Sequence, residues 1–199
     1  MYERRDETSR PRPTRSTRWF GASPTSWAIV TTSVVVLVGC GGARDVESLV
    51  DHEAWTVVSG GASDPFSATN IDPTCDLAST GYELFGGEPS FGIDTERCGY
   101  VTVEQPARTN IEAGDLLHYR LWHFELRAAE PATARIAFAL DRRTVHELEL
   151  AIPGPSGLDA PYFEAPFDVS EGAPVHFHLQ NHGSNSYALL ELTVGGVAP

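Results

Sequence analysis

The stretch "YALLELTV", residues 187–194, alternates two sets of side chains near the C-terminus. Successive side chains of a β-strand point to opposite faces, so this period of two predicts a strand. One face of the predicted strand carries Ala188, Leu190, Leu192 and Val194. The other face carries Tyr187, Leu189, Glu191 and Thr193.

Similar short runs recur along the chain between clusters of Gly, Pro, Asp and Asn. Strands are predicted at 55–59, 81–85, 100–104, 115–128, 135–140, 146–152 and 175–179 in addition to the C-terminal run. No window longer than about ten residues sustains the 3.6-residue period of a helix. About eight or nine short strands predict an all-β fold, a two-sheet β-sandwich of the jelly-roll type.

The N-terminal 39 residues differ in composition from the rest of the chain. Residues 1–27 hold six arginines against three acidic residues, a net charge of +3. The uncharged run "AIVTTSVVVLV" follows at 28–38. As a helix it would span about 16 Å, roughly half of the hydrocarbon core of a bilayer. A basic leader before a short apolar segment predicts a cleavable secretory signal peptide over 1–39.

The motif Leu37-Val38-Gly39-Cys40 ends this apolar segment. It resembles the lipobox of bacterial lipoproteins, in which the chain is cut before the cysteine and the thiol receives a diacylglycerol. The resemblance implies that an acylated Cys40 fastens the protein to the lipid bilayer of the cell envelope. Gly41 follows where an Asp would imply the inner membrane, so the resemblance favours the outer membrane. The alternative is a core cysteine packed beside a strand.

Cleavage before Cys40 would leave 160 residues, enough for one domain. We expect residues 40–51 to be the lipidated cysteine and a polar tether, and residues 52–199 to be the β-sandwich domain. From Cys40 onward, 24 Asp and Glu stand against 8 Arg, a net charge of −16 with neutral His. This charge argues against nucleic acid as a partner, because phosphate binding depends on Lys and Arg.

Two cysteines remain after Cys40, namely Cys75 and Cys98. Exported proteins fold where disulfides persist, so an even pair predicts a disulfide bond. The bond would close a loop of roughly 24 residues and stabilise the fold by about 3 kcal/mol in the chain-entropy model.

Sequence motifs of common enzymes are missing. The chain has no GxSxG elbow, no phosphate-binding glycine loop and no HExxH, since Leu150 stands where the second His would follow His146. Two catalytic carboxylates leave no local motif, so a hydrolase is not excluded. The sequence favours a non-catalytic protein.

The segment "HFHLQNHGSNSY", residues 176–187, is rich in histidine. His176 and His178 fall on one face of a predicted strand, about 7 Å apart, and His182 follows in a loop. Three imidazoles in this arrangement are typical of zinc or copper sites. Further ligands would come from His118, His123 or Glu125. The alternative is a polar, partly solvated sheet face without metal.

A third possibility is a sugar-binding surface, in which aromatic rings stack on sugar faces beside polar groups. Besides the two strand histidines, the residues suited to it are Tyr119, Trp122, Gln180, Asn181 and Tyr187. The rings have the alternative of lying in the core. The pair "RLWHFEL" and "NHGSNSY" is similar to segments of uncharacterised exported lipoproteins, a resemblance that implies no function. We expect a binding or surface-structural module for a glycan or another envelope component, or else a metal-binding protein or metal-dependent enzyme.

Overall fold

The computed structural model describes residues 44–67 and 75–198. These residues form twelve β-strands and one short 3₁₀ turn, η1 (Leu77–Ser79), with no α-helix among them. None of the described segments is a helix with the length and apolarity needed to cross a membrane. The predicted signal peptide and Cys40 lie outside the described residues.

Seven strands form one antiparallel sheet, called sheet A. They are β1 (Glu47–Ser48), β3 (Thr80–Phe85), β4 (Glu88–Asp94), β6 (Leu116–His123), β9 (Gly157–Asp159), β10 (Tyr162–Glu164) and β12 (Ser186–Val194). The main path runs β10-β6-β12-β4-β3, while β1 pairs with β12 and β9 pairs with β6. The edge strand β3 therefore begins a run of four neighbours that ends at β6.

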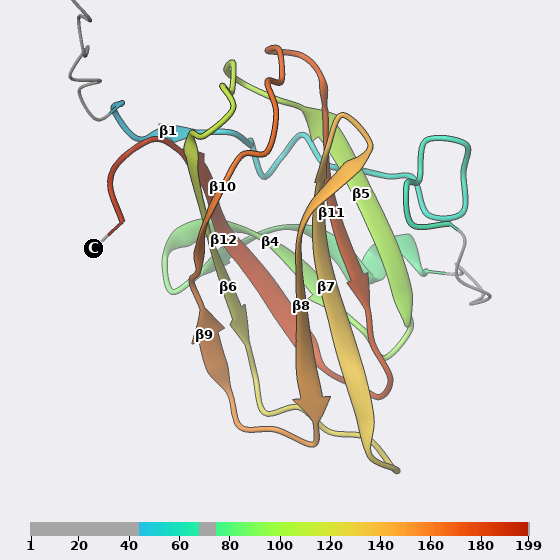
Figure 1. Ribbon diagram of the computed structural model, residues 1–199. Coiled ribbons are helices and arrows are strands. Elements are labelled where there is room, and N and C mark those ends of the chain that lie inside the picture. Colours follow the sequence, from blue (N-terminus) through green and yellow to red (C-terminus); the bar gives the residue numbers. More distant parts are fainter. Residues whose placement is uncertain (1–43, 68–74, 199) are drawn as a thin grey trace, which may run out of the picture. The chain divides into compact units, whose positions relative to one another are not determined.

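Five strands form the second antiparallel sheet, called sheet B. They are β2 (Thr56–Val57), β5 (Tyr100–Pro106), β7 (Ala132–Leu140), β8 (Arg143–Ile152) and β11 (Pro174–Gln180), in the order β2-β5-β11-β7-β8. The chain passes repeatedly between the sheets: β4 is followed by β5, β6 by β7, β10 by β11, and β11 by β12. This alternation confirms the predicted two-sheet, jelly-roll-like sandwich, with sheets A and B side by side in Figure 1.

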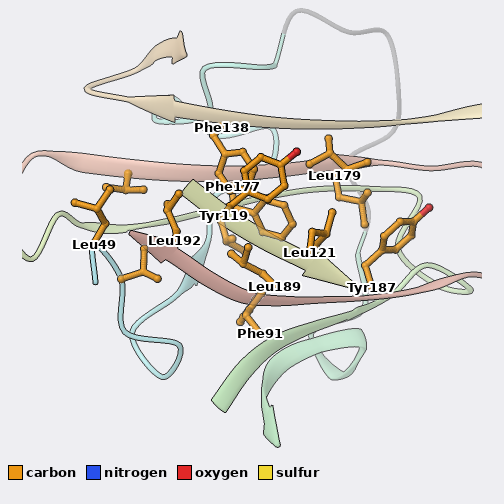
Figure 2. Packing of buried hydrophobic residues seen from close by; sticks show 14 of the residues in the cluster. Leu49, Phe91, Tyr119, Leu121, Phe138, Phe177, Leu179, Tyr187, Leu189 and Leu192 are labelled. Atoms are coloured by element: carbon orange, nitrogen blue, oxygen red, sulfur yellow. The ribbon is translucent and has the colours of Figure 1, made fainter. Parts of the chain in front are cut away.

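The core lies between the two sheets. Phe177 of β11 and Phe138 of β7 stack with ring centroids 5.2 Å apart, and Phe138 lies 4.5 Å from the ring of Tyr119 of β6. Figure 2 shows these rings meeting Leu121 and Leu189 of sheet A. The predicted inward faces of 175–179 and 135–140 are thus confirmed, because a period of two reports which side of each strand is covered.

The predicted faces of the C-terminal strand are correct only up to Leu189. A β-bulge between Leu189 and Glu191 shifts the pairing with β6, so that Leu192 pairs with Tyr119 and both side chains are buried in the core. One extra residue in a strand reverses the alternation beyond it. Tyr187 and Leu189 therefore face inward together with Leu192 and Val194, contrary to the simple alternation.

Several strands were not predicted. The strand β4 was missed because "GGEPSFGID" contains glycines and a proline that are typical of turns. A two-residue turn joins β7 to β8 and places Asp141 and Arg142 at positive φ, as such hairpins require. Eight of the twelve strands have six or more residues, and the rest are segments of two or three residues.

The described N-terminal segment belongs to the folded sandwich. β1 pairs with the end of β12, and the next two side chains, Leu49 and Val50, are 0% and 2% exposed. Arg44 forms ion pairs with Glu47 and Asp115. The folded region therefore begins on the N-terminal side of the boundary expected at residue 52, and only a few residues separate it from Cys40.

The predicted disulfide between Cys75 and Cys98 is present. The two residues also form an isolated antiparallel bridge, just before η1 and just before β5. The bond ties the segment that leads into the edge strand β3 to the start of sheet B.

Candidate functional site

His176 and His178 lie on the outer face of sheet B, as predicted, but both are 0% exposed. Residues 58–67 cover them. Phe66 stacks on the ring of His178 with centroids 4.5 Å apart, and the carbonyl of Ser63 lies 3.1 Å from His176 Nε2. The partly solvated sheet face considered above is therefore not formed at these two residues.

Hydrogen bonds fix both buried rings. His176 Nε2 lies 2.9 Å from the carboxylate of Glu104, and His178 Nδ1 lies 2.9 Å from Thr102 Oγ1. Asp64 holds the covering segment in place by accepting hydrogen bonds from Tyr100 Oη, at 2.8 Å, and from two backbone N–H groups. Burial acts to raise the pKa of Asp64, and these hydrogen bonds outweigh it, so that the pKa is lowered.

Burial lowers the pKa of His178 to about 4, against opposing attraction from Asp64. A neutral imidazole is therefore the form that this site holds at neutral pH. His182 lies apart from the pair, exposed in the loop before β12. No group of three or more His, Cys, Asp or Glu side chains in residues 44–67 and 75–198 is arranged to hold a metal ion.

The five residues expected to form a sugar-binding surface do not share one surface. Tyr119 and Tyr187 are 0% and 2% exposed in the core, where burial raises the pKa of both phenols. Asn181 is also buried, and its amide accepts a hydrogen bond from Tyr187 Oη at 2.8 Å. Gln180, the last residue of β11, lines a separate concavity together with His182. Trp122 alone lies on the outer face of sheet A.

The outer face of sheet A carries the strongest candidate site. A row of cross-strand neighbours places Trp122 of β6 beside Ala188 of β12, Gly92 of β4 and Gly81 of β3. Ala188, Gly92 and Gly81 have side chains no larger than a methyl group, so they form a low floor between larger neighbours, and the side chain of Glu83 lies over Gly92.

Three aromatic side chains gather beside this floor. The ring of Phe85, on the edge strand β3, lies 5.8 Å from Trp122 and 6.0 Å from Phe124. Phe85 and Trp122 are separated by the strands β4 and β12 in the sheet order. Sheet A must curve towards its outer face for these rings to meet, which makes that face concave.

A concavity of about 450 Å³ occupies this curved face. Phe85 and Phe124 line it, and Trp122 packs against both rings. Phe124 is 52% exposed, so its ring is open to a ligand. The polar residues of the lining include Glu83, Asp94 and Ser186, whose positions share the outer face, and Ser79 before β3.

This lining combines flat apolar rings with hydrogen-bonding groups on a rigid sheet. Such a surface suits a sugar, whose C–H faces stack on aromatic rings while its hydroxyls form hydrogen bonds. Glu83, Phe85 and Gly92 were not among the predicted site residues. The strand β4 was not predicted from the sequence. Without it, nothing indicated which strand pairs with β3 or which side chains share its outer face.

No protein-family model matches the chain, and no curated protein sequence matches it. Among solved structures, TmCBM27, a carbohydrate-binding module described for specific mannan recognition, is 8% identical with a TM-score of 0.46 over 79% of this chain and 98% of the module. TmCBM61, solved with β-1,4-galactotriose, is 7% identical with a TM-score of 0.44 over 74% of this chain and 97% of the module.

The family 11 carbohydrate-binding module of the Clostridium thermocellum cellulase Lic26A-Cel5E is similar to the same degree. It is 12% identical with a TM-score of 0.43, over 79% of this chain and 99% of the module. Values this low establish neither a family nor a ligand. The two-sheet fold of this chain is established by its own strand pairing.

Proposed function

We propose that this protein is a membrane-anchored, non-catalytic carbohydrate-binding β-sandwich of the bacterial cell envelope, held by an acylated Cys40 and binding a glycan on the concave outer face of sheet A. The observation that carries the binding function is the concavity lined by Phe85 and Phe124 beside Glu83 and Asp94. The anchor rests on the basic leader, the short apolar run and the lipobox motif at Leu37–Cys40.

The direction of β12 supports the combination of anchor and binding site. Ser186, at the start of β12, lines the concavity, whereas Val194, at its end, pairs with β1 close behind the anchor position. The six residue-to-residue steps from Ala188 to Val194 span about 20 Å of extended strand. The concavity therefore lies near the opposite end of β12 from the strand β1 that follows the proposed anchor in the sequence.

A glycan array with the full chain in detergent micelles tests the binding function. We expect at least one oligosaccharide class to bind, and Phe124→Ala to weaken that binding by at least about fivefold because a stacking ring is lost. The matched control is Tyr162→Ala, which removes an exposed aromatic ring of sheet A outside the concavity. Equal loss in both variants, or no binding by the intact protein, would contradict the proposal.

A further inference from the structure

The carboxylate of Glu83 lies over Gly92 at the floor of the concavity. Glu83 pairs with Ser90 across the β3–β4 hairpin, and its side chain extends over the neighbouring Gly92. A Cβ added at position 92 would lie 2.5 Å from both Cδ and Oε1 of Glu83. The carboxylate occupies its place because residue 92 has no side chain.

This carboxylate is unpaired within the described part of the chain: no hydrogen bond or ion pair to a side-chain oxygen of Glu83 is formed there. Asp94 lies two residues along β4 from Gly92 on the same face, and within the described residues its carboxylate accepts a single hydrogen bond, from the backbone N–H of Glu96. Along the extended strand β4, positions 92 and 94 lie about 7 Å apart. The concavity thus presents two carboxylates with free acceptor capacity beside its aromatic rings.

Among the residues that the structure describes, no basic side chain lines the concavity. The arginines three residues beyond Asp94 and Phe124 are both paired with acidic partners: Arg97 with Asp76, and Arg127 with Glu125. The local field at the floor is therefore negative. A ligand carboxylate or sulfate would be repelled there, whereas an ammonium group would be attracted by the carboxylates and by the faces of the rings.

From this geometry we infer a ligand class, which rests on the proposed carbohydrate-binding function: the concavity selects glycans that contain amino sugars with free, protonated amines. Glu83 is the residue that determines this specificity. The ammonium group of a de-N-acetylated sugar pairs with its carboxylate, while the sugar ring stacks on Phe85 or Phe124. N-acetylation removes the charge and replaces a strong hydrogen-bond donor with a neutral amide. The acetylated form of the same oligosaccharide therefore cannot form the ion pair with Glu83.

Isothermal titration calorimetry with three oligosaccharides of equal length tests the inference: a glucosamine oligomer, its N-acetylated form and an oligogalacturonate. At about pH 6, where primary amines of this kind are charged, we expect the amine form to bind about five- to tenfold more tightly than the acetylated form. The oligogalacturonate should bind most weakly. At about 1 M salt the preference should largely vanish, because the Debye length falls to about 3 Å.

Glu83→Gln keeps the size of the side chain and removes its charge. This variant should bind the amine and acetylated forms equally, within about twofold, and retain the affinity for the acetylated form that stacking supplies. The matched control is Glu88→Gln on β4, a carboxylate of the same hairpin that lies outside the lining. Preference for the amine form should survive in this control.

The outcomes separate the inference from the function on which it rests. If none of the three oligosaccharides nor any other glycan binds, both fail. If glycans bind but the acetylated form binds as well as the amine form, or if Glu83→Gln keeps the preference, only the inference of an amino-sugar ligand fails.

Discussion

Glu83 on β3 lies with its carboxylate against the backbone of Gly92 on β4, where a methyl group would fall 2.5 Å from Oε1. The relationship joins the edge strand to its neighbour and puts a charge at the floor of the concavity. Gly92 therefore leaves room for the carboxylate of Glu83, which a side chain at position 92 would displace.

The first prediction concerns this contact. Gly92→Ala should displace the carboxylate of Glu83 and abolish the preference for amine-bearing glycans, with little change in melting temperature, because the clash falls on the flexible end of an exposed side chain. Gly81→Ala is the control: it pairs with Gly92 in the hairpin, and a Cβ there meets nothing within 4 Å. Equal glycan selectivity in the two variants would argue against a positioned carboxylate.

The second prediction concerns acid stability. His178 has a folded-state pKa of about 4, against 6.5 for an unperturbed histidine. The unfolded chain therefore binds more protons between these values, and the free energy of unfolding should fall as the pH drops from about 6.5 to about 4, by on the order of 3 kcal/mol in total. Above about pH 7 this contribution is fully present. Urea denaturation across this pH range measures it.

His178→Gln is the informative variant for that experiment. The amide can still bond to Thr102, but it does not titrate, so the free energy of unfolding of the variant should decline much less in acid. At neutral pH the variant should be less stable than the wild type, because the packing of the imidazole ring against Phe66 is lost. His182→Gln changes an exposed histidine and should keep the wild-type pH profile. A pH profile unaltered by His178→Gln would assign the acid sensitivity to other groups.

The third prediction concerns the buried amide of Asn181. Its Nδ2 donates to Thr95 Oγ1 at 2.7 Å, and its Oδ1 accepts from Tyr187 Oη at 2.8 Å. Asn181→Leu should lower the free energy of unfolding by about 2–4 kcal/mol, since the buried hydroxyl of Tyr187 loses its acceptor and Thr95 Oγ1 and Asn185 Nδ2 each lose one hydrogen bond. Thermal unfolding measures it, with Tyr187→Phe as a milder change of the same hydrogen bond. A loss below about 0.5 kcal/mol in both variants would contradict the role given to this network.

The fourth prediction concerns the disulfide. Cys75→Ser combined with Cys98→Ser should lower stability by about 3 kcal/mol and the melting temperature by several degrees. The reduced wild-type protein should behave like the double variant. If reductant lowers the melting temperature of the double variant as much as that of the wild type, its effect does not come from this bond.

The fifth prediction concerns the anchor. Cys40→Ser should leave the precursor uncleaved and without acyl label, because the thiol is the acceptor implied by the lipobox resemblance. Metabolic labelling with a fatty acid, followed by mass spectrometry of the N-terminus, measures both effects. Normal labelling of the variant would refute the anchor at this cysteine.

Local pattern accounted for most of the sandwich. Alternation placed Val175, Phe177 and Leu179 on the inner face of β11, and the even pair of cysteines predicted the bond that is present. Both inferences depend on neighbouring residues or on simple counting. Where the pattern was interrupted, as by the glycines of β4 or the bulge after Leu189, alternation did not predict the strand or its inward face correctly.

Most of the long strands, the inward faces of several of them and the negative charge of the chain were readable from the sequence alone, because a period of two and a composition depend only on adjacent residues. Only the tertiary structure decided that residues 58–67 bury His176 and His178, and that the curvature of sheet A brings Phe85 to Trp122 and Phe124 around an unpaired Glu83. Those contacts join residues far apart in the chain, so they depend on which strands pair and how the sheet curves, and no local period encodes either.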